Sequence, residues 1–172
     1  MIIFATCCFI GHRVIEYTIE LEQKLREYIE YLILNKNVGC FLFGSRSKFD
    51  ELCLKIVTEL KIKYPYIKRI YVRAEFQNID KSYEEYLLKS YDETFFPKQI
   101  QNAGKFSYVE RNQIMIDKSD YCVFYYKENY IPPTKKANKR GLFNKCNSGT
   151  KLALDYAKQK KKEIVIINKN NV

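Results

Sequence analysis

Three short segments combine small residues with side chains that bind phosphate. They are Gly11-His12-Arg13, Gly44-Ser45 and Asn147-Ser148-Gly149-Thr150, and each lies where a strand-like pattern gives way to a helix-like one. The first amides of a helix have no partner within it and lie at the positive end of its dipole. Glycine admits a phosphate against the backbone, and Ser and Thr add hydroxyl donors. One such segment is an ordinary helix cap, but three together predict a shared anion site.

Charged side chains accompany these segments. His12 is the only histidine. It is either a hydrogen-bonded residue at a strand end or a ligand contact or general base, and we favour a structural or ligand-positioning role over catalysis. Arg13 follows it directly, Asp50 lies shortly after Gly44-Ser45, and Arg73 lies near the end of a third strand-like run. We expect these four side chains to contact the same ligand.

The segment Glu110-Arg111-Asn112 places opposite charges side by side on a short helix-like stretch. A solvated ion pair is the simplest explanation. Alternatively, the planar guanidinium of Arg111 binds a phosphate or a ribose, with Asn112 beside it and Glu110 as a ribose contact or acid-base group. Glu110 and Arg111 are therefore the catalytic candidates if the protein is an enzyme.

The elements that position these residues alternate along the chain. Apolar runs typical of buried strands occupy 2–13, 38–43, 67–75, 121–126 and 163–168. Helical periodicity occupies 18–35, 49–60, 108–118 and 147–161. This alternation predicts an α/β fold, a Rossmann-like, doubly wound and mainly parallel sheet in three α/β/α layers, with strand order 3-2-1-4-5. Ligands bind at the carboxyl ends of such strands.

The segment 76–107 is harder to interpret. Its pattern allows a helix over 82–91, whereas 94–105 contains Pro97 and Gly104 and looks irregular. Because this gap between two strands is long for a connection, we expect a further element in it. The basic segment 135–151 is most simply solvated charge, and the alternatives are a lid over an anion or a nucleic-acid contact.

Composition limits the classes of function. The chain has 172 residues, of which 47% are hydrophobic, and this suits a single domain over 1–172. Its formal net charge of +10 permits a nucleotide, a nucleic acid or an acidic membrane surface as partner. No apolar run approaches a membrane span. The six cysteines lack a metal-ligand spacing, and a Walker loop and a dinucleotide fingerprint are absent. We expect a cytoplasmic protein with no metal and no membrane partner.

Together the motifs resemble the bacterial SLOG superfamily. Segments 7–13, 43–50, 67–73, 109–120 and 148–150 carry the resemblance by their order and spacing, and the chain is similar to the YpsA-like group, a domain of unknown function. The resemblance implies a Rossmann-like fold related to the lonely-guy phosphoribohydrolases and to DNA-processing protein A. It also implies nucleotide-derived ligands, often a sensor role, and self-association as a homodimer.

The resemblance also implies roles for single residues. Glu110 and Arg111 match the Glu and Arg of the phosphoribohydrolase H-E-R-K signature, and the segment 148–150 matches the end of its P-G-G-x-G-T-x-E phosphate loop. Leu152 and Ala153 stand where the enzymes carry catalytic glutamates. The resemblance therefore implies nucleotide binding more strongly than hydrolysis.

We therefore expect a sensor or regulatory module that binds a nucleotide or a nucleotide-derived ligand at the C-terminal edge of the sheet, with no further cofactor. Two alternatives stay open. One is hydrolysis of a nucleotide N-glycosidic bond with Glu110 as the acid-base group, and the other is a basic protein that associates with nucleic acid.

Overall fold

The computed structural model describes residues 3–131 and 148–169, in which six strands form one sheet in the order β4-β3-β2-β1-β5-β6. The strands are β1 (Ala5–Gly11), β2 (Val38–Phe43), β3 (Lys68–Val72), β4 (Glu93–Phe95), β5 (Tyr121–Tyr125) and β6 (Glu163–Ile166). All five pairings between neighbours are parallel.

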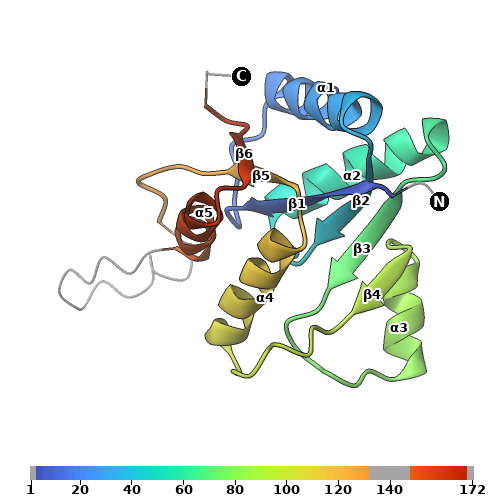
Figure 1. The fold of residues 1–172 in the computed structure, drawn as a ribbon, viewed down its shortest axis with the longest axis vertical. Helices are drawn as coiled ribbons and strands as arrows, with labels where there is room; N and C mark the ends of the chain where they lie inside the picture. The colour runs from blue at the N-terminus through green and yellow to red at the C-terminus, as the bar shows by residue number, and fades with distance from the viewer. Residues whose placement is uncertain (1–2, 132–147, 170–172) are drawn as a thin grey trace.

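Helices cover both faces of this sheet (Figure 1). Helices α1 (Ile19–Asn35) and α2 (Lys48–Lys63) pack on one face, and α4 (Lys105–Asp117) and α5 (Gly149–Gln159) pack on the other. Helix α3 (Lys81–Leu88) lies beside β4 (Figure 1). The predicted three-layer, Rossmann-like α/β fold is confirmed.

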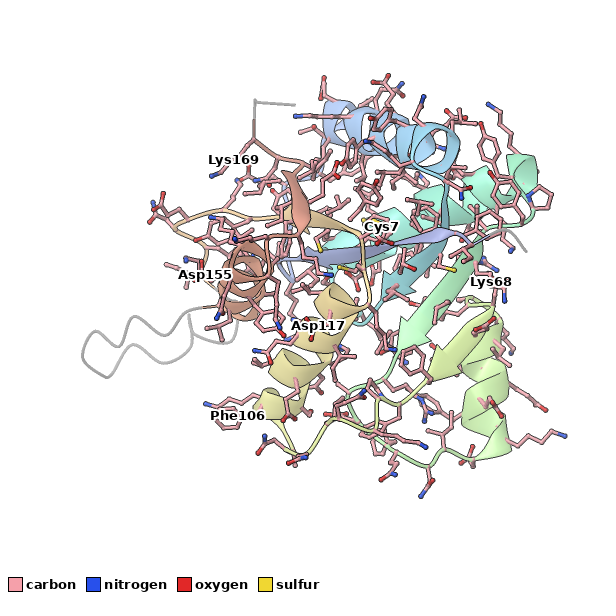
Figure 2. All side chains as sticks on the ribbon, in the orientation of Figure 1. Cys7, Lys68, Phe106, Asp117, Asp155 and Lys169 are labelled. Atoms are coloured by element: carbon pink, nitrogen blue, oxygen red, sulfur yellow. The ribbon has the colours of Figure 1, made fainter. Side chains whose placement is uncertain are left out.

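Strand β1 is buried on both faces, as its nearly continuous apolar run predicts. Cys7 and Phe9 point into the core under α1 and α2, whereas Cys8 and Ile10 point into the core under α4 and α5. Figure 2 shows Cys7 inside the layers and charged side chains such as Lys169 at the periphery. This central strand therefore fixes the position of the residues that follow its carboxyl end.

The sheet order agrees with the predicted 3-2-1-4-5 for the five strands found from sequence, and β4 adds one strand at the edge. The further element expected in 76–107 comprises α3 and β4. The helix expected over 82–91 ends at Leu88 instead. Helix α4 begins at Lys105, earlier than expected, after Gly104 with a φ of 63° that favours glycine. The irregular segment is therefore shorter than its sequence suggests.

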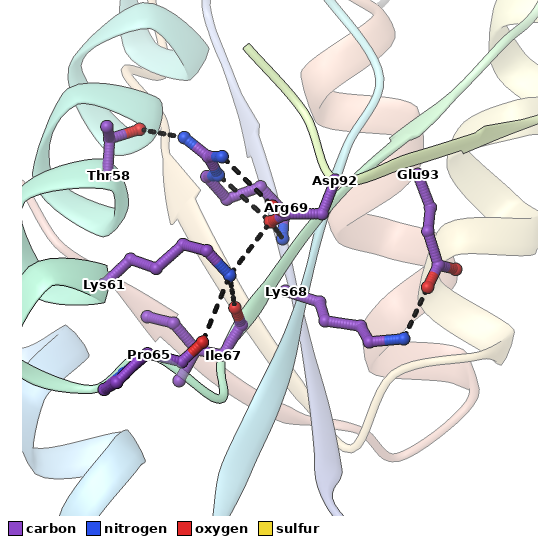
Figure 3. Close-up of polar contacts among 8 residues, drawn as sticks. All are labelled: Thr58, Lys61, Pro65, Ile67, Lys68, Arg69, Asp92 and Glu93. Carbon is purple, nitrogen blue, oxygen red and sulfur yellow. Dashed lines mark hydrogen bonds and ion pairs between the residues drawn. The ribbon is translucent and has the colours of Figure 1, made fainter. Parts of the chain in front are cut away.

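An ion cluster holds the three-residue β4 against β3 (Figure 3). Arg69 donates to both carboxylate oxygens of Asp92 at 3.1 Å and to Thr58 Oγ1 at 3.1 Å, and its amide donates to Asp92 Oδ2 at 2.8 Å. Lys61 lies 3.4 Å from the same carboxylate. Local propensity alone would not sustain so short a strand, and this cluster compensates for it.

The predicted basic segment lies mostly outside the described residues, so its three interpretations stay predictions. Among residues 3–131 and 148–169, no helix is both long and apolar enough to cross a membrane.

Candidate functional site

A cavity of about 1040 Å³ opens at the carboxyl edge of the sheet. Its lining includes all twelve residues expected to contact a ligand, which are Gly11, His12, Arg13, Gly44, Ser45, Asp50, Arg73, Arg111, Asn112, Ser148, Gly149 and Thr150. The chain leaves β1 toward one face of the sheet and β5 toward the other. Neighbouring loops diverge at such a switch point and leave a crevice between them.

His12 is almost fully buried at the end of β1, with 1% of its surface exposed. The ring of Tyr130 stacks on it with centroids 3.8 Å apart and planes 9° apart. The Tyr130 hydroxyl in turn accepts a hydrogen bond from the Val14 amide at 3.2 Å. Burial lowers the pKa of His12 to about 4, so the imidazole is neutral at pH 7.

The tautomer of His12 follows from its partners. The Lys127 amide donates to Nε2 at 2.8 Å, which is shorter than the 3.2 Å between Nε2 and the Lys127 carbonyl; that carbonyl also accepts from the Tyr130 amide at 3.3 Å. Because an amide can only donate, we assign Nε2 as the acceptor and place the proton on Nδ1. Nδ1 is buried and has no partner among the described residues. The cavity wall therefore contains a fixed donor that no described protein group satisfies.

Arg111 is held by the end of β2. Its Nη1 donates to the Gly44 carbonyl, and its Nη2 and Nε both donate to Asn112 Oδ1, at 3.1 and 3.2 Å. The guanidinium lies 5.5 Å from the centre of the Tyr108 ring. A Cβ at Gly44 would lie 2.6 Å from Arg111 Nε and from the sulfur of Met115. Position 44 therefore needs glycine so that the arginine can pack against the backbone.

Asp50 occupies the loop between β2 and α2. Its carboxylate accepts hydrogen bonds from the Ser45 amide at 2.9 Å and from the Gly44 amide at 3.4 Å. Burial raises the pKa of Asp50 to about 6, although these amides and the charge of Arg111 oppose the rise. The two amides that were expected to hold a phosphate therefore donate to the Asp50 carboxylate in this structure, and their contact with a ligand stays a prediction.

The first turn of α5 has a different arrangement. Ser148 is the N-cap, and its hydroxyl accepts from the Lys151 amide at 3.1 Å. The Gly149 and Thr150 amides have no partner among the described residues, as is usual for a helix start. A Cβ at Gly149 would meet no described atom within 4 Å. This turn therefore borders the cavity with amides that have no partner in the described part of the chain.

The other glycine expected to approach a ligand has a packing role. A Cβ at Gly11 would lie 2.3 Å from the ring of Phe49 on α2. The missing side chain of Gly11 thus lets α2 pack closely against β1, although the residue also borders the cavity.

Several lining residues were not found from the sequence. Arg46 follows β2, and Tyr71, Tyr83, Tyr108 and Tyr130 add aromatic rings. Tyrosine is so frequent in this chain, with 15 copies, that no single one stands out. Only a correct placement of 76–107 would have brought Tyr83 to the site, whereas Tyr108 lies on the helical stretch 108–118 that also carries Arg111.

Glu110 does not line the cavity. Its carboxylate accepts from the Asn102 amide at 3.0 Å, from Asn102 Nδ2 at 2.8 Å and from the Gln101 amide at 3.2 Å. The hydrogen bonds from Asn102 and Gln101 lower the pKa of Glu110. In this geometry the carboxylate organises the loop that precedes α4.

Comparison with known proteins adds information about the fold. The chain matches no protein-family model and no curated protein sequence. Among solved structures it is similar to DNA processing protein A from Helicobacter pylori, described for its single-stranded DNA binding mode, with a TM-score of 0.58 and 14% identity. The match covers 94% of this chain and 64% of that one, so this chain spans less than two-thirds of its neighbour. At this identity the likeness shows a shared Rossmann-like fold.

Proposed function

We propose that this protein binds a nucleotide or a nucleotide-derived ligand in the cavity at the carboxyl edge of its sheet. One observation carries the proposal, namely that Nδ1 of His12 is buried and has no partner among the described residues. The tautomer assigned above places the proton of the neutral ring on this atom. An unsatisfied buried donor costs about 1–3 kcal/mol, and a ligand acceptor would recover that cost.

The phosphate of this ligand belongs at the N-terminus of α5. The Gly149 and Thr150 amides have no partner among the described residues, and the helix dipole favours an anion there. The amides of Gly44 and Ser45 are a poorer choice because Asp50 already accepts from them.

The remaining lining suits the base and the sugar. Four arginines, Arg13, Arg46, Arg73 and Arg111, and four tyrosine rings border the cavity. Aromatic and guanidinium planes both stack on nucleobases. The resemblance to the SLOG superfamily points to the same class of ligand.

A sensor role fits better than hydrolysis. Glu110 accepts three hydrogen bonds from the loop before α4 and lies outside the cavity lining. Leu152 and Ala153 occupy the positions of the catalytic glutamates in the resembling enzymes. Turnover of a bound nucleotide would instead require a carboxylate at the reacting bond.

Nucleic-acid binding is the second candidate function. The net charge of +10 and the similarity to a protein described as binding single-stranded DNA both favour it. Single-stranded DNA offers the same two groups as a nucleotide, a phosphate and a stackable base, so the two candidates must be separated by experiment.

Calorimetry with Gly149→Asp separates them. An aspartate in the first turn suits the helix dipole, and a Cβ at this position meets no described atom within 4 Å. We therefore expect the fold to persist while the new carboxylate repels a bound phosphate. Nucleotide affinity should fall at least tenfold. Gln159→Glu, the same change of charge at the other end of α5, should leave the affinity unchanged. Equal nucleotide affinity in wild type and Gly149→Asp would contradict the proposal.

A further inference from the structure

Arg73 has a second buried donor, its Nε–H, without a partner in the described part of the chain. It directly follows β3, and its amide donates to the Phe95 carbonyl of β4 at 2.9 Å. In its guanidinium, Nη1 donates to the Phe76 carbonyl at 2.8 Å. Nε is buried and has no partner among the described residues. The guanidinium is therefore held in place at the wall of the cavity that Arg73 lines, and its buried Nε–H has no described acceptor.

This side of a guanidinium has a definite chemical preference. Nε–H and Nη2–H form a planar fork that binds two neighbouring acceptors at once. The candidate groups are a phosphate, a carboxylate and the O6/N7 edge of guanine, which is the commonest base partner of arginine.

The surrounding charges decide among these groups. Glu75 and Asp80 also line the cavity, and Glu84 acts on Arg73 through its charge. The negative charge of Glu84 at Arg73, together with the carboxylates of Glu75 and Asp80 in the lining, disfavours an anionic partner for Arg73. These groups have a second consequence. They favour a neutral group that offers donors as well as acceptors, and guanine carries N1–H and N2–H₂ beside its O6 and N7.

Aromatic rings complete this end of the cavity. Tyr71, Tyr83, Phe76 and Tyr108 all line it, and the Tyr108 hydroxyl is hydrogen-bonded to Glu75. Flat rings of this kind stack on any base, whichever hydrogen-bonding groups its edge carries. Stacking therefore contributes affinity for any base, while Arg73 and the carboxylates determine which base is preferred.

We propose that the ligand is a guanine nucleotide, with O6 and N7 on the Arg73 fork and a carboxylate of Glu75 or Asp80 facing N1–H and N2–H₂. This inference rests on the proposed function, which places the phosphate on α5. Strands β3 and β5 are three positions apart in the sheet, about 14 Å at ordinary strand spacing. That span suits a nucleoside diphosphate or triphosphate better than a monophosphate.

Calorimetry with paired nucleotides tests the choice of base. GDP should bind at least tenfold more tightly than ADP, and 7-deaza-GDP, which lacks N7, should lose most of that advantage. Inosine diphosphate, which keeps O6 and N7 but lacks N2–H₂, should fall between GDP and ADP. These comparisons use the wild-type protein, so folding of a variant does not affect them.

Arg73→Lys provides the protein side of the test. Lysine keeps the charge but lacks the fork. The ratio of GDP affinity to ADP affinity should therefore fall toward one, while the ADP affinity itself changes little. Arg26→Lys, on α1 and outside the cavity lining, should keep the full preference.

The outcomes distinguish the two proposals. Equal binding of GDP and ADP, both lost in Gly149→Asp, would overturn the guanine inference and leave the proposed function standing. A GDP preference that survives Arg73→Lys would also overturn the inference. Absence of binding by every nucleotide would overturn both proposals.

Discussion

At the scale of single residues, the site combines groups held in unusual states. His12 is neutral because it is buried, and its tautomer follows from the Lys127 amide. Asp50 is buried and faces both Arg111 and two backbone amides. The sequence identified these residues as members of one site but not their states, because burial and tautomer depend on Tyr130 and Lys127, which are more than a hundred residues from His12 in the chain.

The pH dependence of stability tests the state of His12. Its pKa is lowered to about 4 in the folded protein from about 6.5 in the unfolded chain. The unfolded state therefore takes up the proton first as pH falls, and folding stability contributed by neutral His12 is lost between pH 6.5 and pH 4. In urea titrations, wild type should lose about 2–3 kcal/mol relative to His12→Gln across this range, since one pKa unit is about 1.4 kcal/mol. Parallel pH profiles for the two proteins would refute a buried neutral histidine.

Two glycines of the site should respond differently to alanine. Gly44→Ala places Cβ against Arg111 and Met115, and overpacking of this kind costs about 1–3 kcal/mol. Gly149→Ala places Cβ where no described atom lies within 4 Å, and restricting the unfolded chain should stabilise the protein by up to about 1 kcal/mol. Denaturant unfolding of both variants measures the difference, and an equal loss in the two would contradict the packing described for Gly44.

At the scale of elements, hydrophobic periodicity predicted the long elements and the strand order, because five apolar runs alternate with helical stripes. It did not identify β4, which has only three residues and depends on the tertiary ion cluster of Arg69 and Asp92 (Figure 3). The sequence also did not predict that the Asp50 side chain folds back onto the Gly44 and Ser45 amides, which is a tertiary contact; the phosphate contact expected at Gly44-Ser45 stays a prediction.

The edge strand should depend on Asp92. Asp92→Ala removes a partly buried carboxylate that accepts three hydrogen bonds from Arg69, and we expect a loss of about 1.5–3 kcal/mol in the free energy of unfolding. Glu93→Ala removes the neighbouring exposed pair with Lys68 and should cost less than about 1 kcal/mol. If thermal or denaturant unfolding shows the two variants to be equally stable, the cluster does not hold β4.

At the scale of the whole molecule, the formal net charge of +10 favours any anionic partner, and salt dependence distinguishes the kinds of partner. A nucleotide neutralises few positive charges, so its affinity should change by less than about tenfold between 50 and 200 mM salt. A nucleic acid that contacts 6–10 phosphates would lose about 10³-fold or more over the same range. Fluorescence anisotropy with a labelled nucleotide and a labelled single-stranded oligonucleotide gives both slopes. A steep slope for the oligonucleotide with no nucleotide binding would favour the nucleic-acid function.

The central claim is that the first turn of α5 and the Nδ1–H of His12 bind the ligand. Nuclear magnetic resonance of ¹⁵N-labelled protein during titration with GDP tests it most directly. We predict that the amide signals of Gly149 and Thr150 and the imidazole Nδ1–H signal of His12 shift as they form hydrogen bonds, while the Gly44 and Ser45 amides keep their bonds to Asp50. Shifts confined to Gly44 and Ser45, or no shift in the α5 turn and His12 at saturation, would contradict the account.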